Sequence, residues 1–208
     1  MRMKTCIIFG NAEISDYSFI QPISAEDFVI SADGGWRHLK RLGIKPHLFI
    51  GDMDSFQGIL PDDIAKEYYK PEKDDTDTFI AVKKGLSLGC DRFVLYGCLG
   101  GSLGHTLANM QILVYLAKRN IPAVLRDEKS EVYAVSNATL HFDASRTGKI
   151  SVISFSEKSD GVTLRGLKYP LEDAVIRNDY ALGVSNEFLQ KNSSITVKNG
   201  DLIVIIEK

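Results

Sequence analysis

The stretch that decides the fold is residues 92–126, "RFVLYGCLGGSLGHTLANMQILVYLAKRNIPAVLR". It opens with an apolar run, passes through a glycine-rich segment into a helical pattern, and ends in a second apolar run. Runs that are apolar on both faces are typical of strands covered on both sides of a sheet. The stretch therefore predicts a strand, a helix and a parallel strand. Four glycines lie in its connection: Gly97, Gly100, Gly101 and Gly104.

The same alternation occupies the whole first part of the chain. We expect strands at residues 5–10, 27–33, 47–52, 92–98 and 122–127. We expect helices at residues 34–43, 76–89 and 105–120, the last with an apolar stripe of Leu107, Met110, Leu113, Val114 and Ala117. This order predicts an α/β domain, residues 1–127, with a mostly parallel, Rossmann-like sheet.

After about residue 128 the pattern changes to short β-rich runs separated by turn residues. They cover residues 131–136, 138–143, 149–156 and 161–167. The last run, "SSITVKNGDLIVIIEK" at 193–208, has Asn199-Gly200 between two β-branched segments. That dipeptide is a strong hairpin signal, so we expect a β-hairpin there. Residues 128–208 are therefore predicted to form a small all-β domain.

Composition excludes several classes of protein. The 208 residues are 44% hydrophobic and carry a net charge of -2, an ordinary globular balance with no basic footprint for nucleic acid. Apolar runs are too short for a membrane span or a signal peptide, so we expect a cytoplasmic protein. The three cysteines lack metal spacing and are expected to be buried, reduced thiols. Walker and GxSxG motifs are missing, which argues against P-loop enzymes and common serine hydrolases.

Acidic residues follow the predicted strands repeatedly. Asp33 closes one strand, Asp52 and Asp54 follow the next, and Asp74 and Asp77 precede a helix. Ligands of open parallel sheets bind beyond the carboxyl ends of the strands, where these side chains would gather. Helix capping is the alternative for Asp33 and Asp74, taken singly.

Carboxylates that lie so close together need a cation. Like charges raise each other's pKa unless a positive charge neutralises them. A site of hard oxygen ligands suits Mg²⁺, usually together with substrate phosphates. The residues alone therefore predict an α/β enzyme that handles Mg²⁺ and phosphate, and they leave the substrate open.

Six motifs, in order, resemble the thiamine pyrophosphokinase family over nearly the whole chain. They are "SADGGWRHL" (31–39), "IGDMDSF" (50–56), "KDDTDTFIAV" (73–82), "GCLGGSLGHTLANMQIL" (97–113), "GLKYPL" (166–171) and "GVSNEF" (183–188). The resemblance implies transfer of the diphosphate of ATP to thiamine, giving thiamine diphosphate and AMP. It implies an N-terminal domain that binds ATP and Mg²⁺, and a C-terminal β-sandwich that binds thiamine and dimerises. The active site would lie between the subunits of the homodimer.

Site residues follow from the motif match. The catalytic carboxylates would be Asp33, Asp52, Asp54 and Asp77, of which Asp52, Asp54 and Asp77 would hold the metal. ATP and its phosphates would meet Lys73, Asp74, Gly100, Gly101, Ser102 and His105. Thiamine would meet Ser185, Asn186, Glu187, Lys168 and Tyr169. Without the resemblance, Lys168 and Tyr169 would be read as ordinary surface residues.

The chain departs from the family pattern in two motifs. The family loop usually reads GGRxDH, whereas Ser102 and Gly104 stand here in place of the arginine and the aspartate. Trp36 and Arg37 replace smaller and amide residues, and Arg37 is a candidate for the missing positive charge. Trp36 is either a core residue or a ligand wall. These departures leave open a non-catalytic or weakly active protein that binds nucleotide or thiamine on the same fold, or a diphosphokinase for another hydroxymethyl heterocycle.

Overall fold

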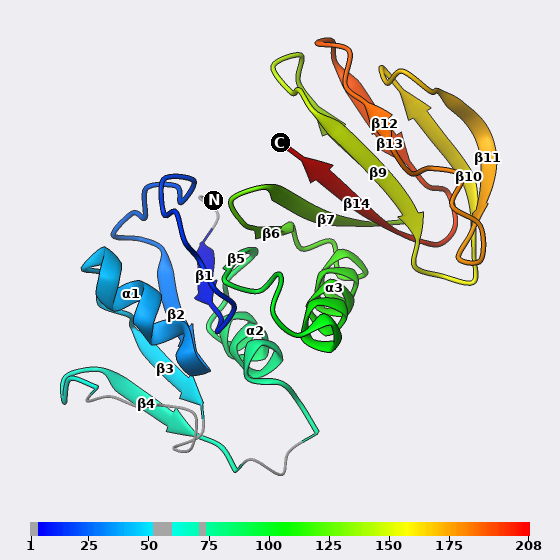
Figure 1. Ribbon diagram of the computed structural model, residues 1–208. Coiled ribbons are helices and arrows are strands. Elements are labelled where there is room, and N and C mark those ends of the chain that lie inside the picture. The colour runs from blue at the N-terminus through cyan, green and yellow to red at the C-terminus, as the bar shows by residue number, and fades with distance from the viewer. Residues whose placement is uncertain (1–3, 52–59, 71–73) are drawn as a thin grey trace. The chain divides into compact units, whose positions relative to one another are not determined.

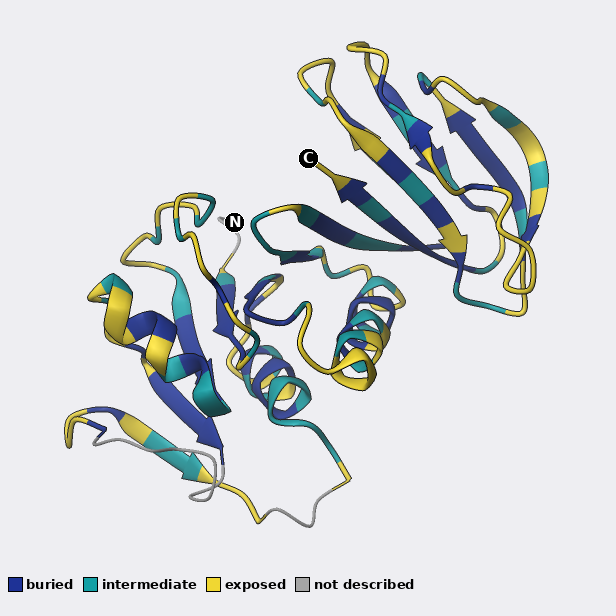
Figure 2. Cartoon of the chain, viewed as in Figure 1, coloured by how far each residue is buried: buried dark blue, intermediate teal, exposed yellow. Residues whose placement is uncertain are grey.

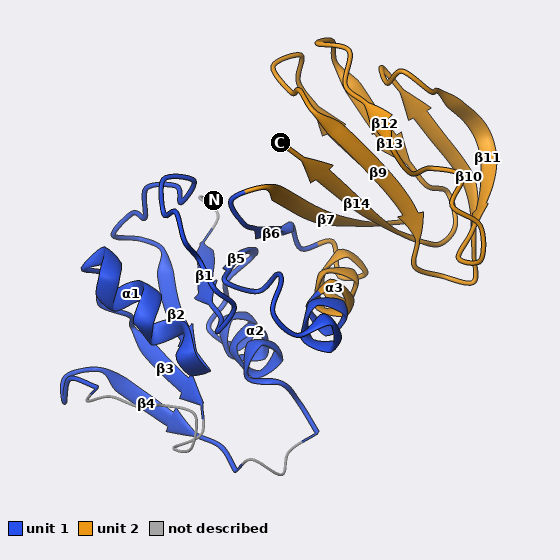
Figure 3. Ribbon diagram, viewed as in Figure 1, with its two compact units in different colours: residues 1–109, 121–128 blue, residues 110–120, 129–208 orange. Residues whose placement is uncertain are grey.

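The computed structural model describes residues 4–51, 60–70 and 74–208 (Figure 1). The chain divides into two compact units (Figure 3). The first comprises Met1–Asn109 and Ile121–Glu128, and the second comprises Met110–Asn120 and Lys129–Lys208. Each unit is described by itself below.

The first unit is built on a parallel sheet. Its strands are β1 (Thr5–Phe9), β2 (Phe28–Ala32), β3 (Leu48–Gly51), β4 (Ala65–Tyr68), β5 (Arg92–Tyr96) and β6 (Ala123–Arg126). They lie in the order β6-β5-β1-β2-β3-β4, and every neighbouring pair is parallel. The predicted parallel sheet and its five predicted strands are confirmed. Strand β4 was not predicted, because its sequence "AKEY" is polar and half exposed, as befits an edge strand.

Helices cover both faces of this sheet. They are α1 (Trp36–Leu42), preceded by the 3-10 turn η1 (Asp33–Gly35), and α2 (Asp77–Ser87). A third helix, α3 (Leu103–Ala117), begins in the first unit and continues into the second. Phe9 packs in one apolar cluster with Leu39 of α1, whereas the Cys6 sulfur lies against Gly85 of α2. Successive side chains of a strand point to opposite faces, so α1 and α2 lie on opposite faces of the sheet. Figure 2 shows the strands between them as buried.

Single residues determine where α1 ends and where α2 begins. Gly43 closes α1 in the left-handed conformation, with φ of 67°. Thr76 caps α2, since its hydroxyl accepts a hydrogen bond from the Phe79 amide. The capping alternative for the two aspartates is therefore wrong: Asp33 lies inside η1, and Asp74 precedes the true cap.

Two apolar predictions are settled by burial. Trp36 is partly buried and packs against the clusters of Leu39 and Phe49, which favours the core alternative, and it is not among the described lining residues of the pocket below. Leu107 is 49% exposed, so the apolar stripe predicted for α3 is wrong at that position, whereas Leu113 is buried as expected.

All three cysteines are buried and free, as predicted. Among the described residues, none of the helices has the length and apolarity needed to cross a membrane.

The second unit is a sandwich of two antiparallel sheets. One has the order β12 (Asn186–Glu187), β9 (Lys149–Ser154), β14 (Asp201–Glu207), β7 (Ser130–Ser136). The other has the order β11 (Leu171–Arg177), β10 (Lys158–Arg165), β13 (Ser193–Thr196), β8 (Thr139–Phe142). Side chains of both sheets, such as Val204 and Val162, form one apolar core. The expected β-sandwich is confirmed.

The hairpin predicted around Asn199-Gly200 is wrong. Strand β13 pairs with β10 and β8, whereas β14 pairs with β7 and β9, so the chain crosses from one sheet to the other. Gly200 has a positive φ of 125°, but Asn199 does not, and a two-residue type I′ turn requires both. Asn199 instead forms a bridge with Asp160. Both runs can bury their apolar residues because the two sheets face the same core.

Candidate active site

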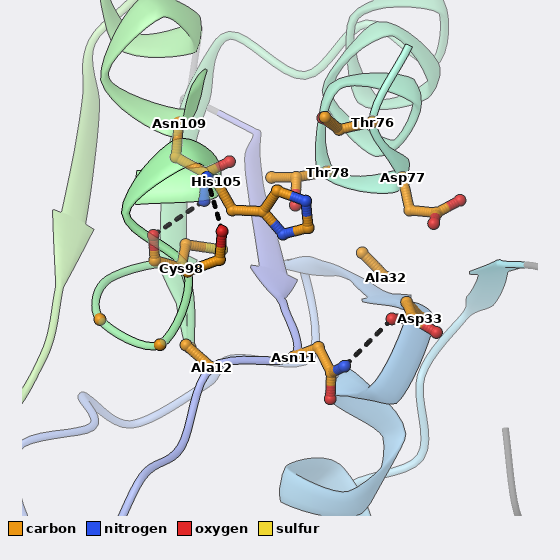
Figure 4. A pocket seen from close by; sticks show the side chains of 14 residues that line it. Asn11, Ala12, Ala32, Asp33, Thr76, Asp77, Thr78, Cys98, His105 and Asn109 are labelled. Atoms are coloured by element: carbon orange, nitrogen blue, oxygen red, sulfur yellow. Dashed lines mark hydrogen bonds between the residues drawn. The ribbon is translucent and has the colours of Figure 1, made fainter. Parts of the chain in front are cut away.

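The carboxyl edge of the parallel sheet carries a pocket. From β1 the chain leads to β2 on one side, and from β5 it leads to β6 on the other side. Connections that diverge in this way open a crevice between adjacent strands, where open α/β sheets bind ligands. A pocket of about 240 Å³ lies there (Figure 4). Its described lining is Asn11, Ala12, Ala32, Asp33, Thr76, Asp77, Thr78, Gly97, Cys98, Gly100, Gly101, Ser102, His105 and Asn109.

The floor of the pocket is a close crossing of two backbone segments. The amide of Gly10 donates to the Tyr96 carbonyl at 2.8 Å, and that of Ala12 donates to the Gly97 carbonyl at 2.8 Å. A β-carbon at Gly97 would lie 2.6 Å from the Gly10 oxygen, closer than real contacts allow. Glycine is needed there for contact, and also because φ is 62°.

The glycine pair farther along the loop has a different role. Gly100 and Gly101 have φ of 80° and 64°, and a β-carbon at either would meet no atom within 4 Å. Their backbone is open to the pocket rather than packed. The loop leads directly into α3, whose N-terminus is the positive end of the helix dipole. This arrangement suits a phosphate.

Ser102 caps α3. Its hydroxyl accepts a hydrogen bond from the amide of His105 at 3.4 Å, and its carbonyl accepts one from the amide of Thr106 at 3.0 Å. The serine that replaces the family arginine therefore stabilises the helix N-terminus. Arg37, the candidate replacement for that charge, bonds the Asn11 carbonyl and Glu13 and is not among the described lining residues.

Helix α3 contributes two side chains, one turn apart. Figure 4 shows the His105 ring projecting into the pocket. Asn109 is buried and donates its amide hydrogen to the Cys98 carbonyl at 2.8 Å. This bond ties the glycine loop to the helix that follows it.

Two carboxylates come from different elements. Asp33 follows β2, and Asp77 begins α2. Asp33 has φ of 51°, a conformation that costs energy in a non-glycine residue and is concentrated at functional sites. The described lining residues include no lysine or arginine. Carboxylate oxygens are ligands that a hard divalent cation prefers, so these two residues are compatible with Mg²⁺.

Thiolate chemistry does not fit the pocket. Burial raises the pKa of the Cys98 thiol to about 12, so it stays protonated at neutral pH. A protonated thiol is a poor nucleophile. Cys98 therefore contributes packing and its carbonyl oxygen.

The structure brings some of the predicted nucleotide and metal residues together in the pocket and places others outside it. Asp33, Asp77, Gly100, Gly101, Ser102 and His105 share the pocket. Asp52, Asp54 and Lys73 lie outside the described residues. Asp74 is exposed and lines a separate hollow beside Glu67 and Lys83. In the described residues no group of three or more potential metal ligands is assembled.

The predicted thiamine residues of the second unit lie together. The Asn186 side chain accepts from the Tyr169 amide at 2.9 Å and donates to the Tyr169 carbonyl at 2.7 Å. Lys168 pairs with the Glu187 carboxylate at 3.0 Å. Ser185 has φ of 60°, and its amide donates to the Ser151 hydroxyl. Hydrogen bonds and an ion pair therefore join the motifs "GLKYPL" and "GVSNEF".

Sequence reasoning missed several lining residues. Asn11 directly follows the loop glycine after β1, so the rule that placed Asp33 at a strand end could have found it. Asn109 lies four residues after His105, on the same face of a helix. Thr76 is a hydroxyl residue just before an acidic helix start, a recognisable cap. No such signal marks Thr78.

Comparison with known proteins identifies the family. A model described as "Thiamin pyrophosphokinase, catalytic domain" matches residues 19–125, and one described as "Thiamin pyrophosphokinase, vitamin B1 binding domain" matches residues 135–204. The chain belongs to the thiamine pyrophosphokinase family. The predicted family is confirmed, and with it the enzyme class, an ATP-dependent diphosphotransferase.

Individual members of the thiamine pyrophosphokinase family resemble the chain over most of its length. Thiamine pyrophosphokinase of Bacillus subtilis (strain 168) is 31% identical over 182 residues, 85% of each chain. Thiamin pyrophosphokinase 1 of Caenorhabditis elegans is 27% identical over 165 residues, covering 72% of this chain and 68% of the relative. The crystal structure of the Bacillus subtilis enzyme superposes with a TM-score of 0.85, covering 99% of both chains at 27% identity. That of thiamin pyrophosphokinase from Geobacillus thermodenitrificans gives 0.83 at 27% identity, covering 98% of this chain and 97% of the other.

Proposed function

We propose that the chain transfers the diphosphate group of ATP to the hydroxyl of thiamine in the pocket lined by Asp33 and Asp77. The observation that carries the proposal is the meeting of two carboxylates, an open glycine backbone and a helix N-terminus in one crevice. A polyphosphate and its counter-ion need this combination. Membership of the thiamine pyrophosphokinase family supports the choice of substrates.

The chemistry requires little covalent work from the protein. The thiamine hydroxyl oxygen forms a bond to the β-phosphorus of ATP. The bond between that phosphorus and the oxygen that bridges the α- and β-phosphorus atoms breaks. AMP leaves with the bridging oxygen, and the hydroxyl proton passes to a base or to water. Catalysis then depends on positioning and on neutralising phosphate charge. The backbone of Gly100 and Gly101 and the first turn of α3 are proposed to receive phosphate oxygens.

Mg²⁺ is the proposed metal. Asp77, with Asp52 and Asp54 of the sequence motif, would hold it, and Asp33 would lie beside them. When bound there, the ion supplies Lewis-acid neutralisation of the phosphate oxygens. The protein's own contribution is to fix Asp33 and Asp77 on the same side of the pocket (Figure 4).

The second unit is proposed to bind thiamine. Tyr169 is 57% exposed, and its backbone is held by the buried Asn186, so a ring is presented on a fixed loop. Lys168, Glu187 and Ser185 surround that loop. In this proposal residues 1–127 form a Rossmann-like ATP and Mg²⁺ domain, and residues 128–208 form the thiamine and dimerisation domain. The enzyme works in the cytoplasm as a homodimer with its active site between subunits.

The proposal is tested by incubating the protein with ATP, Mg²⁺ and thiamine. We expect AMP and thiamine diphosphate in equal amounts. Formation of ADP would indicate transfer of one phosphoryl group instead. Absence of turnover, with thiamine binding seen by calorimetry, would indicate a binding protein and would refute the proposal.

The role of the pocket is tested with Asp33→Asn. Asparagine tolerates the positive φ of this position, so the substitution removes the charge and leaves the backbone as it is. We expect kcat/KM for diphosphate transfer to fall about 100-fold, as when one electrostatic contact to a transition state is lost. The matched control is Asp91→Asn, an exposed carboxylate just before β5 at the opposite edge of the sheet. Equal rates for both variants would place the chemistry elsewhere.

A further inference from the structure

Side chains of α1 hold the loop that follows β1. The Arg37 guanidinium donates to the Asn11 carbonyl at 2.6 Å and pairs with the Glu13 carboxylate at 3.2 Å. The ring Nε2 of His38 bonds the carbonyl of Ala12 at 2.8 Å. Two successive carbonyls are therefore fixed by two successive residues of one helix. These bonds anchor the loop, although it has no regular secondary structure.

The partners of the His38 ring fix which of its nitrogens carries the hydrogen. A carbonyl only accepts, so Nε2 carries the hydrogen, and Nδ1 is free to accept from the Tyr17 hydroxyl at 2.7 Å. His38 is 1% exposed, and burial lowers its pKa. The ring is therefore neutral at physiological pH, with both nitrogens used inside the protein.

The anchored loop presents one side chain to the pocket. Asn11 donates from Nδ2 to Oδ2 of Asp33 at 3.1 Å, and both residues line the pocket (Figure 4). The Asn11 amide also packs on the backbone after Asp33, because a β-carbon at Gly34 would lie 1.9 Å from its oxygen. The amide thus touches the Asp33 carboxylate and the turn that follows it.

We propose that Asn11 is a positioning residue that orients the Asp33 carboxylate, and that Arg37 and His38 act through it. This inference rests on the role of Asp33 in the proposed function. A carboxylate that accepts a hydrogen bond from an anchored amide loses rotational freedom. Hydrogen bonds to charged groups are among the stronger ones in proteins, so the constraint is substantial.

The test is a double-mutant cycle of Asn11→Ala and Asp33→Gly. Glycine removes the carboxylate and suits the positive φ at position 33. Both the rate of diphosphate transfer and the affinity for Mg²⁺-ATP are measured for the four proteins. We expect Asn11→Ala to lower kcat, or the affinity, about tenfold in the native background, the equivalent of one hydrogen bond to a charged group. In the Asp33→Gly background it should change either quantity less than twofold.

The proposal would be overturned if the fold-change of the double variant equalled the product of the fold-changes of Asn11→Ala and Asp33→Gly. Asn11 would then act independently of Asp33. A fall in the unfolding midpoint of Asn11→Ala that accounts for the lost activity would also overturn the proposal. The control is Asn178→Ala, an exposed asparagine of the second unit, which should leave both quantities unchanged. Arg37→Ala should lower the same parameter as Asn11→Ala, and the two together should not exceed Asn11→Ala alone. If the unmodified protein binds Mg²⁺-ATP but makes no thiamine diphosphate, the proposed function fails while the binding cycle still decides the role of Asn11.

Discussion

Ser102 stabilises a helix end at the position where the family pattern has an arginine. In the family pattern an arginine at this position would supply a bidentate donor for phosphate. The serine supplies no charge, but its hydroxyl caps α3. Among the described lining residues His105 alone can carry a positive charge near the phosphates. In the function proposed above, Ser102 itself brings no positive charge to the phosphates, so a metal ion and backbone amides would have to supply what the arginine supplies in the family pattern.

We expect Ser102→Arg to tighten binding of Mg²⁺-ATP about tenfold, because the guanidinium would add a charge-assisted bond to a phosphate. The same change should destabilise the protein by about 1 kcal/mol through loss of the cap. Calorimetric titration and chemical denaturation measure the two effects.

Ser102→Ala separates these contributions, since it removes the cap and adds no charge. Adding Gly104→Asp to Ser102→Arg places a carboxylate in the first turn of α3, which should recover part of the stability. If Ser102→Arg binds Mg²⁺-ATP no more tightly than Ser102→Ala, the side chain does not reach the phosphates.

At the scale of elements, packing requires glycine at some positions and leaves room for a side chain at others. A β-carbon at Gly35 would lie 1.9 Å from the Phe9 carbonyl oxygen, so η1 can sit against the end of β1 only without a side chain. Gly104 is helical, and the nearest atom to its β-carbon would be the Ser102 hydroxyl at 3.8 Å. Packing therefore requires glycine at position 35 but not at position 104.

Gly35→Ala should therefore destabilise the protein by about 3 kcal/mol or more, as expected for forced overpacking against backbone. Gly104→Ala should stabilise it by about 0.5–1 kcal/mol, because alanine loses less entropy in a helix. Urea denaturation of both variants checks the pair. Similar losses for the two would mean that the close approach at Gly35 is not what limits the position.

At the scale of the whole molecule, the sequence predicts the parallel sheet because its strands are continuous apolar runs between good helix patterns. It predicts the pocket because carboxylates follow strands whose ends must share one edge. It fails for β13 and β14 because turn chemistry at Asn199-Gly200 is local, whereas the choice of sheet depends on strands distant in the chain. The anchoring of Asn11 by Arg37 and His38 also escapes prediction, since only the packed fold brings α1 against that loop.

Buried thiols offer a test of the integrity of the first unit. Cys6, Cys90 and Cys98 are at most 4% exposed and form no disulfide. We expect a thiol reagent to leave the native protein unmodified and to label all three cysteines in denaturant. The rate of native labelling should then follow the opening of the sheet. Rapid labelling of any one cysteine under native conditions would contradict the burial seen around it.

The placement of β14 has a consequence for synthesis. This strand lies between β7 and β9, yet it leaves the ribosome only after β10, β11, β12 and β13 have been made. Until then, β7 and β9 each present an unpaired edge, and such edges invite pairing with other chains. Contacts between residues so distant in the chain also form slowly. The growing polypeptide is therefore most vulnerable to aggregation in the interval before its central strand emerges.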